Sequence, residues 1–328
     1  MTLPKHSRLF VSFLLAVLAG CTPARVREAD RSVGLYHLEP WQFENQPGRV
    51  MVTPHYRIHV TLKEGNEEGD LNDASAGQLA VLMESAYEQY RKLLPDVSPS
   101  ERPLECFVFA SRRDWARFTA KHAGKNAAIY LQIQRGGYTQ GDVFVAFWVG
   151  PDSTRSLAAH EGWHQFAGRH FVGRIPPALE EGLACLFEQQ RWEDGRPIFS
   201  IESNTRRARA VALLIYEKRL LPLAELVTLH AGQVVESKVI GTEGWYGQVW
   251  ALASFLRDGD GGAHRAGLQN LLNDAAAGTI FDPTGTHQRV DIAWDSRGVV
   301  PMFEHYFGMP IDRLDRAFRA YMKQFETE

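Results

Sequence analysis

The chain has 328 residues, of which 45% are hydrophobic, so it can bury a sizeable core in one large domain or two ordinary ones. Its formal charge is −3 at neutral pH. A nucleic-acid-binding protein is therefore not expected, because such proteins present a strongly positive surface. With three cysteines, the chain is not a disulfide-rich scaffold.

The N-terminus has the pattern of an export signal. Lys5 and Arg8 precede a short apolar run, residues 9–19, which is closed by small residues and a cysteine. That run is too short to span a bilayer in a mature protein. We therefore expect residues 1–20 to be a signal peptide. Its removal takes away two positive charges and no acidic residue, which changes the formal charge from −3 to −5.

The end of this segment, Leu18-Ala19-Gly20-Cys21, resembles the lipobox of bacterial lipoproteins. The resemblance implies cleavage before Cys21 and acyl chains on that cysteine, which would hold the protein at a membrane. We expect a lipid-anchored protein of the bacterial cell envelope, at the outer membrane and facing the periplasm. The alternative is an ordinary secretory signal with a chance cysteine. Cys106 and Cys185 then remain, either as one disulfide or as buried thiols.

Two segments follow the signal. Residues 21–48 show no sustained periodicity, and we interpret them as a tether and lead-in segment. Residues 49–150 mix strand and helix patterns. Strands are expected at 55–62, 104–110, 128–133 and 142–149, and helices at 75–94 and 111–122. Paired glycines within residues 134–138 suit a hairpin loop between the last two strands.

Residues 151–328 carry mainly helical patterns. Helices are expected at 154–168, 178–190, 204–216, 223–230, 244–256, 263–273 and 311–325. The predicted fold class is α+β, with a half that holds a small mixed β-sheet and flanking helices, followed by a mostly helical half. The halves are expected to associate closely, because no Pro- and Ser-rich linker separates them.

Two histidines and a glutamate stand together on the helix expected at 154–168. His160 and His164 are one helical turn apart, so their imidazoles point from one face and can bind one ion. Glu161 lies about 100° around the helix from His160. There it is suited to take a proton from a water molecule at the metal. A catalytic zinc site needs a third protein ligand as well.

The next helix offers candidates for that ligand. Pro176 and Pro177 begin it, and Glu180 and Glu181 lie in its first turn, where either carboxylate can complete the site. Glu188 follows seven residues after Glu181, on nearly the same helical face. Its carboxylate, or a backbone oxygen, could accept the second N–H of a histidine ligand.

These residues resemble the gluzincins, a group of zincin-like metalloproteases. The resemblance lies in His160-Glu161-Gly162-Trp163-His164 and in Glu181-Gly182-Leu183-Ala184, which begins after a gap of sixteen residues. Gly136-Gly137-Tyr138, the segment 246–252 and Tyr306-Phe307-Gly308 are similar to uncharacterised bacterial secreted peptidase-like proteins. Together the similar parts cover about residues 55–325.

The resemblance implies a zincin-like fold, a zinc cofactor and a peptide or protein substrate. In that reading His160, His164 and Glu181 hold zinc, Glu161 is the general base and Tyr246 donates a hydrogen bond to the oxyanion. The strand expected at 142–148 would be the edge strand beside the cleft, where an extended peptide can pair with it.

Two features depart from the family pattern. The gap of sixteen residues is slightly shorter than in the best-studied gluzincins, and Cys185 stands where some of them carry an aspartate. Tyr246 also fits a core position, because it falls at helical spacing with Val249, Trp250 and Ala253.

The predicted function is a zinc-dependent hydrolase of gluzincin type, foremost a peptidase that cleaves an amide bond with metal-activated water. One alternative is an envelope protein that keeps the zincin fold for binding or as a scaffold without catalysis. The other is a zinc hydrolase of a non-peptide amide in the cell wall.

Overall fold

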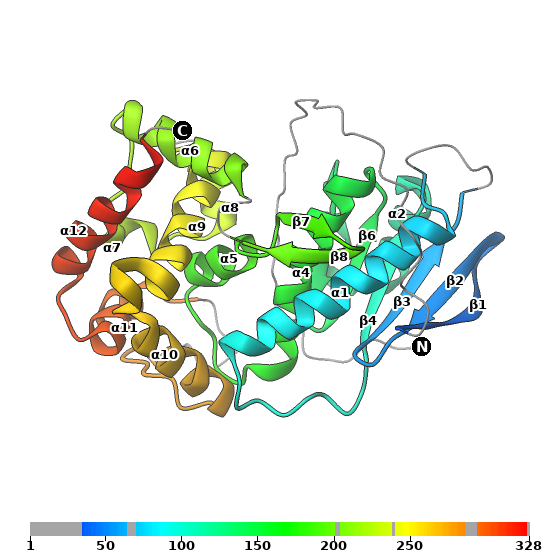
Figure 1. Ribbon diagram of the computed structural model, residues 1–328, viewed down its shortest axis with the longest axis horizontal. Coiled ribbons are helices and arrows are strands. Elements are labelled where there is room, and N and C mark those ends of the chain that lie inside the picture. The colour runs from blue at the N-terminus through cyan, green and yellow to red at the C-terminus, as the bar shows by residue number, and fades with distance from the viewer. Residues whose placement is uncertain (1–34, 64–69, 201–203, 238–239, 286–293, 327–328) are drawn as a thin grey trace. The chain divides into compact units, whose positions relative to one another are not determined.

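The computed structural model describes residues 35–63, 70–200, 204–237, 240–285 and 294–326. The predicted signal peptide and Cys21 lie outside these ranges. Contacts divide the chain into two compact units (Figure 1). Unit 1 comprises the chain up to Tyr90, residues 99–169 and residues 190–199, and unit 2 comprises residues 91–98, 170–189 and 200–328.

Unit 1 is built around a six-stranded mixed sheet in the order β1-β2-β3-β4-β6-β5. The strands are β1 (His37–Phe43), β2 (Gln46–Val52), β3 (Tyr56–Thr61), β4 (Leu104–Phe109), β5 (Gly137–Gln140) and β6 (Val143–Phe147). The central strands β3, β4 and β6 are parallel, whereas β1, β2 and β5 pair antiparallel with their neighbours. Three of the four expected strands are present, as β3, β4 and β6, and the α+β class is confirmed.

One face of this sheet is covered by α1 (Asp73–Leu93) and α4 (Pro151–His170), and Figure 1 shows α1 running across it. The ring of Tyr87 on α1 stands edge-on to Tyr56 of β3, with centroids 5.9 Å apart. On α4, Gln165 accepts a hydrogen bond from the buried thiol of Cys106 in β4 at 3.4 Å. The helix with the two histidines is therefore held directly against the sheet.

The opposite face packs on α2 (Arg112–His122), which is followed by η1 (Gly124–Asn126) and the short α3 (Ala127–Tyr130). Phe118 and Trp115 of α2 contact Phe109 and Phe147 of the sheet, with ring centroids 5.2 Å apart in both pairs. Alternate residues of β6 join this cluster, as the two-residue period of a strand requires.

Gly162, inside the histidine motif, is a packing requirement of unit 1. A Cβ atom at this position would lie 2.7 Å from the Tyr90 hydroxyl and 3.2 Å from the terminal methyl of Met83, both on α1. The same hydroxyl donates a hydrogen bond to the carbonyl oxygen of Ala159 at 2.5 Å. The absence of a side chain therefore lets α1 and α4 approach closely.

Unit 2 is helical. Its helices are α5 (Pro177–Cys185), α6 (Thr205–Tyr216), α7 (Leu223–Leu226), α8 (Ala231–Ser237), α9 (Thr242–Asp258), α10 (Arg265–Ala277), α11 (Val299–Phe307) and α12 (Ile311–Met322). Every residue of α9 from Trp245 to Leu256 is buried, and both α5 and α6 pack on it. A Cβ at Gly182 would lie 2.3 Å from the carbonyl oxygen of Val249, so the α5–α9 contact requires glycine there.

The prediction of a strand at 128–133 is wrong. Residues 127–130 form α3, and the strand β5 lies instead at 137–140, beginning inside the segment 134–138 that was interpreted as a hairpin loop. The hairpin turn is formed by Gly141, whose φ is +65°, and Asp142, between Gln140 and Val143. A Gly-Asp pair before an apolar run is a turn signal that would have located this hairpin.

The strand expected at 142–149 is confirmed as β6, but its predicted place at the edge is wrong. β6 lies between β4 and β5, and β5 is the edge strand on that side of the sheet. The cause is the misplaced hairpin, because moving the turn to Gly141 adds one strand outside β6.

Other elements were not expected from the sequence. β1 and the start of β2 lie within the segment interpreted as a lead-in, and α11 was missed. The helix expected at 178–190 ends at Cys185, and β7 (Gln190–Glu193) and β8 (Arg196–Phe199) form a separate hairpin. Its turn, Asp194-Gly195, has positive φ at both residues, which is the type I′ signal.

Cys106 and Cys185 are both buried free thiols, which is the second of the two alternatives. Among the described residues, no helix has the length and apolar character needed to cross a membrane. The division of the chain at residue 150 remains a prediction. In the structure α4, which follows that position, is part of unit 1 up to Arg169.

Candidate metal centre

His160 and His164 meet on the buried face of α4 in unit 1. Their side chains are 0% and 1% exposed, and the two Nε2 atoms lie 3.4 Å apart. Two nitrogens bound to one tetrahedral zinc at about 2.0–2.1 Å are separated by roughly 3.3 Å. The spacing of the two imidazoles therefore fits two ligands of one such ion.

A direct hydrogen bond between the rings explains this spacing less well. An N–H···N contact of 3.4 Å is longer than the usual range of about 2.7–3.2 Å for protein hydrogen bonds. The ring planes meet at 67°, with centroids 5.1 Å apart, so the imidazoles converge at their Nε2 atoms without stacking. Converging lone pairs are the arrangement that a shared ion requires.

Glu161 is fully buried beside the first histidine. Its carbonyl oxygen accepts a hydrogen bond from the hydroxyl of Thr139 at 3.2 Å, which joins α4 to the edge strand β5. The phenol of Tyr130 has a raised pKa, first because it is buried and further because of Tyr138 and the negative charge of Glu161. Tyr130 was not singled out from the sequence, because it fell in a segment assigned to a strand.

Glu180 lies in the first turn of α5 in unit 2, and Glu181 follows it at the start of the second turn. Pro176 precedes the helix, and its carbonyl oxygen accepts a hydrogen bond from the backbone N–H of Glu180 at 3.0 Å. The side chains of Glu180 and Glu181 are 3% and 4% exposed. A carboxylate this far from water needs a positive or hydrogen-bonding partner, and a metal ion is one such partner.

Buried histidine and glutamate side chains of this chain could hold a metal ion. Among the described residues there are two such groupings, one of His160, His164 and Glu181 and the other of His160, Cys185 and Glu188. The first contains the three ligands that the resemblance implies. Its two nitrogens and one carboxylate are donors that suit zinc.

Glu188 is held by a network within unit 2. Arg207 of α6 donates to both carboxylate oxygens, from Nε at 2.8 Å and from Nη2 at 2.7 Å. The amide of Asn204 donates to Glu188 at 3.3 Å and to the Cys185 carbonyl oxygen at 3.1 Å. Glu188 does not lie on α5, because that helix ends at Cys185 and the chain continues in tight i→i−3 turns.

Arg207 is a fully buried charge that the sequence analysis did not identify. Burial disfavours its charged form, but the carboxylates of Glu188 and Glu243 more than offset this and raise the pKa of the guanidinium. Its central carbon lies 4.9 Å from the centre of the Tyr246 ring. Tyr246 itself is 1% exposed on α9, with the ring of Trp245 edge-on at 5.0 Å.

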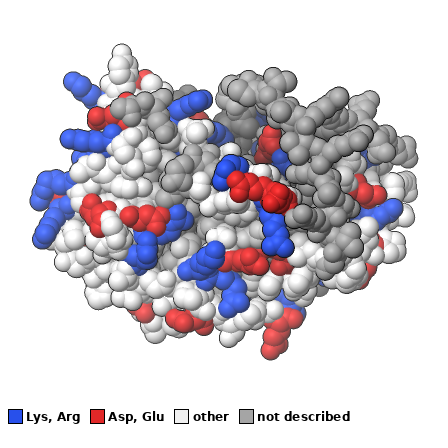
Figure 2. Space-filling view, viewed as in Figure 1, with Lys and Arg blue, Asp and Glu red and all other residues white. Residues whose placement is uncertain are grey.

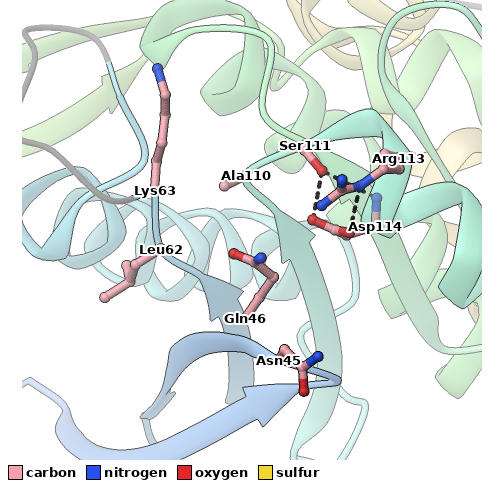
Figure 3. Close-up of a pocket in the computed structure, with 8 residues that line it drawn as sticks. All are labelled: Asn45, Gln46, Leu62, Lys63, Ala110, Ser111, Arg113 and Asp114. Atoms are coloured by element: carbon pink, nitrogen blue, oxygen red, sulfur yellow. Dashed lines mark hydrogen bonds and ion pairs between the residues drawn. The ribbon is translucent and has the colours of Figure 1, made fainter.

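A separate pocket of unit 1 lies at the carboxyl ends of β3 and β4 (Figure 3). Its volume is about 550 Å³. The charged side chains near it pair with one another: Lys63 with Asp70 at 2.9 Å, and Arg113 with Asp114 at 3.3 Å. Its lining includes one carboxylate and no histidine or cysteine, so it does not resemble a metal site.

The molecular face in Figure 2 carries positive and negative side chains next to one another. Close pairs of opposite charge in the described part of the chain include Arg206 with Glu243 and Arg319 with Asp315. On this face, side chains of one charge do not form a continuous patch.

No protein-family model matches the chain, and neither a curated protein nor a solved structure was found to match it. The described residues therefore define the class only as an α+β protein with buried side chains that could hold a metal ion.

Proposed function

We propose that this protein is a zinc-dependent peptidase of gluzincin type with a zincin-like fold. His160, His164 and Glu181 hold the metal, and Glu161 is the general base. The observation that carries this proposal is the 3.4 Å separation of two buried Nε2 atoms on one helix, beside a buried glutamate. The histidine motif and the buried Glu-Glu-Gly turn of α5 support it.

Zinc at such a site supplies Lewis acidity toward the scissile carbonyl and lowers the pKa of a water molecule. The Glu161 carboxylate accepts a proton from the attacking water and returns it to the leaving amine. Because Glu161 is buried, its carboxylate works without competition from bulk water. The hydroxyl of Tyr246 donates a hydrogen bond to the negative charge that develops on the carbonyl oxygen.

The edge of the sheet supports a peptide as the substrate. β5 is an edge strand, and its Thr139 contacts the backbone of α4 at Glu161. An extended peptide can add to such an edge through main-chain hydrogen bonds. The opposite edge is less suited, because Pro40 in β1 lacks the N–H that a further strand would need.

Metal content tests the site. We expect about one zinc per chain, by mass spectrometry, in the purified mature protein, and none in a variant with His160→Ala and His164→Ala. The matched control is His170→Ala, at the end of the same helix, which should keep the metal. Equal zinc content in all three proteins would exclude the two histidines as ligands.

Turnover of a peptide library separates catalysis from the alternatives. Glu161→Gln should keep the zinc and lose roughly 10²- to 10⁴-fold in kcat, because the base is removed and the ligands remain. A wild-type protein that binds zinc but cleaves no peptide would favour a binding protein or a hydrolase of cell-wall amides. Full activity of Glu161→Gln would exclude Glu161 as the base.

We also propose that the protein is exported and anchored by lipid at Cys21. The pattern of residues 1–21 supports this. Mass spectrometry of the mature N-terminus should find an acylated Cys21, and Cys21→Ser should release the protein from the membrane fraction. An unmodified N-terminus elsewhere would favour ordinary secretion.

A further inference from the structure

Arg207 lies at the centre of a buried polar cluster in unit 2. Its side chain is 0% exposed, and a guanidinium buried this deeply is costly unless its charge is paired. Asn204 caps α6 by accepting the backbone N–H of Arg207 at 3.2 Å, so the residue begins the helix in a fixed position. The cap at Asn204 therefore fixes the backbone from which the buried side chain of Arg207 extends.

One edge of the guanidinium is used by Glu188. The two parallel hydrogen bonds, at 2.8 and 2.7 Å, form a bidentate pair, which restricts rotation of the guanidinium plane. A third N–H group, Nη1, lies 3.3 Å from Glu243, which is also paired with Arg206. These contacts orient the flat face of Arg207 as well as neutralise its charge.

The guanidinium lies over the ring of Tyr246, with its central carbon 4.9 Å from the ring centre. A cation over an aromatic ring attracts the ring's electron density and restricts ring rotation. Both effects improve the Tyr246 hydroxyl as a hydrogen-bond donor. A ring that has lost electron density makes the hydroxyl a stronger donor, and a ring that cannot rotate keeps the hydroxyl pointing in one direction. Lysine would keep the charge but not the planar group or the bidentate pair with Glu188.

We propose that Arg207 is a positioning residue that acts through Tyr246. It fixes the phenol ring and strengthens its hydroxyl as a hydrogen-bond donor to the substrate carbonyl. This inference rests on the proposed peptidase function and on Tyr246 as its oxyanion donor. The alternative is that Arg207 has only a structural role, as the ion-pair partner of Glu188. In that case the effect of substituting Arg207 would not depend on Tyr246.

A double-mutant cycle on the zinc-loaded full chain distinguishes these roles. Arg207→Lys should lower kcat for a peptide substrate about tenfold and change KM less than twofold, with unchanged zinc content. In a Tyr246→Phe background the same substitution should have no further effect on kcat. Arg206→Lys, the neighbouring residue on α6 that pairs with Glu243, is the matched control and should leave kcat unchanged.

A second readout does not depend on activity. In the metal-free protein, Arg207→Lys should change the near-ultraviolet circular dichroism of the tyrosines, and the change should be absent in the Tyr246→Phe background. Should Arg207→Lys fail to fold, Arg207→Met combined with Glu188→Met removes both charges and leaves no unpaired one. That paired variant should show the same dependence on Tyr246.

The outcomes separate the two proposals. The role of Arg207 would be overturned if its substitution left kcat unchanged, or if the losses in kcat from Arg207→Lys and Tyr246→Phe multiplied in the double variant. Either result would leave the proposed peptidase function standing. Absence of any peptide turnover by the wild-type protein would overturn the proposed function and with it this role of Tyr246.

Discussion

Gly162 and Gly182 show how single positions in the candidate site serve packing as well as chemistry. Each lies next to a predicted site residue, and at each a Cβ atom would collide with a neighbouring helix of the same unit. The collision at Gly182 is with backbone, whereas at Gly162 the closest atom is the end of the Tyr90 side chain. The glycines of both motifs are therefore explained without any ligand.

Gly162→Ala should lower the free energy of unfolding by roughly 1–2 kcal/mol, as overpacking outweighs the better helix propensity of alanine. Urea denaturation of the metal-free protein measures this. Adding Tyr90→Phe removes the oxygen at 2.7 Å, so the second substitution should recover part of the loss caused by the first. A Gly162→Ala protein as stable as the wild type would contradict this packing account.

The buried carboxylate of Glu84 should make the stability of unit 1 depend on pH in the acid range. Burial raises its pKa, but hydrogen bonds from His55 and Thr53 more than offset this, so the carboxyl pKa is lowered from 4.5. A lowered pKa in the folded state stabilises the protein above pH 4.5, and this contribution is lost as the pH falls through the folded value.

Glu84→Gln should therefore lower Tm at neutral pH and flatten the decrease of Tm below pH 4.5. Calorimetry across this range checks both effects. Glu88→Gln, an exposed position one turn later on α1, is the control and should follow the wild-type profile. Equal acid sensitivity in Glu84→Gln and the wild type would refute the assignment.

At the scale of elements, helix caps set where the helices begin. Ser111 caps α2 by accepting the backbone N–H of Asp114 at 3.1 Å, and its hydroxyl donates back to the Asp114 carboxylate at 2.7 Å. Ser111 also lines the pocket at the carboxyl ends of β3 and β4 (Figure 3). The contacts of this side chain are those of a cap, which argues for a structural role.

Ser111→Ala should lower the free energy of unfolding by about 1 kcal/mol, because one orphan backbone donor and the buried Asp114 lose their partner. Ser111→Thr keeps a hydroxyl and should stay within a few tenths of a kcal/mol of the wild type. Zinc content should not change in either variant. A stability of Ser111→Ala equal to that of Ser111→Thr would show that the cap contributes nothing.

At the scale of the whole molecule, the proposed zinc site makes the stability of the folded protein depend on the metal. A ligand that binds only the folded protein stabilises it, by about 2.7 kcal/mol when free zinc is 100 times Kd. If His160, His164 and Glu181 bind one ion, zinc should therefore stabilise the folded protein.

Thermal unfolding with and without zinc tests this. The wild type should show a higher Tm with zinc, and the variant with His160→Ala and His164→Ala should show none of the increase. Glu181→Gln should weaken the effect, because one charged ligand is replaced by a neutral amide. A full increase in Glu181→Gln would exclude Glu181 and favour Glu180 as the third ligand.

Local patterns alone determined much of this protein. The helices around His160 and Glu181, the parallel strands β3, β4 and β6, and the α+β class follow from residue periodicity, which acts over a few neighbours. The spacing of His160 and His164 is equally local, since one helical turn sets it. The turns at Gly141 and at Asp194 were not recognised from the sequence, and the misplaced hairpin at Gly141 is the reason that the predicted edge strand was wrong.

Only the tertiary structure decided which distant side chains meet. Arg207 and Glu188 are nineteen residues apart, and Arg207 reaches Tyr246 from another helix, so periodicity cannot predict that these three form one buried network. The sequence likewise marks Gly162 and Gly182 only as glycines, while the approach of α1 and of α9 makes them necessary. Such contacts depend on how helices pack, and packing is settled by shape complementarity across the whole core.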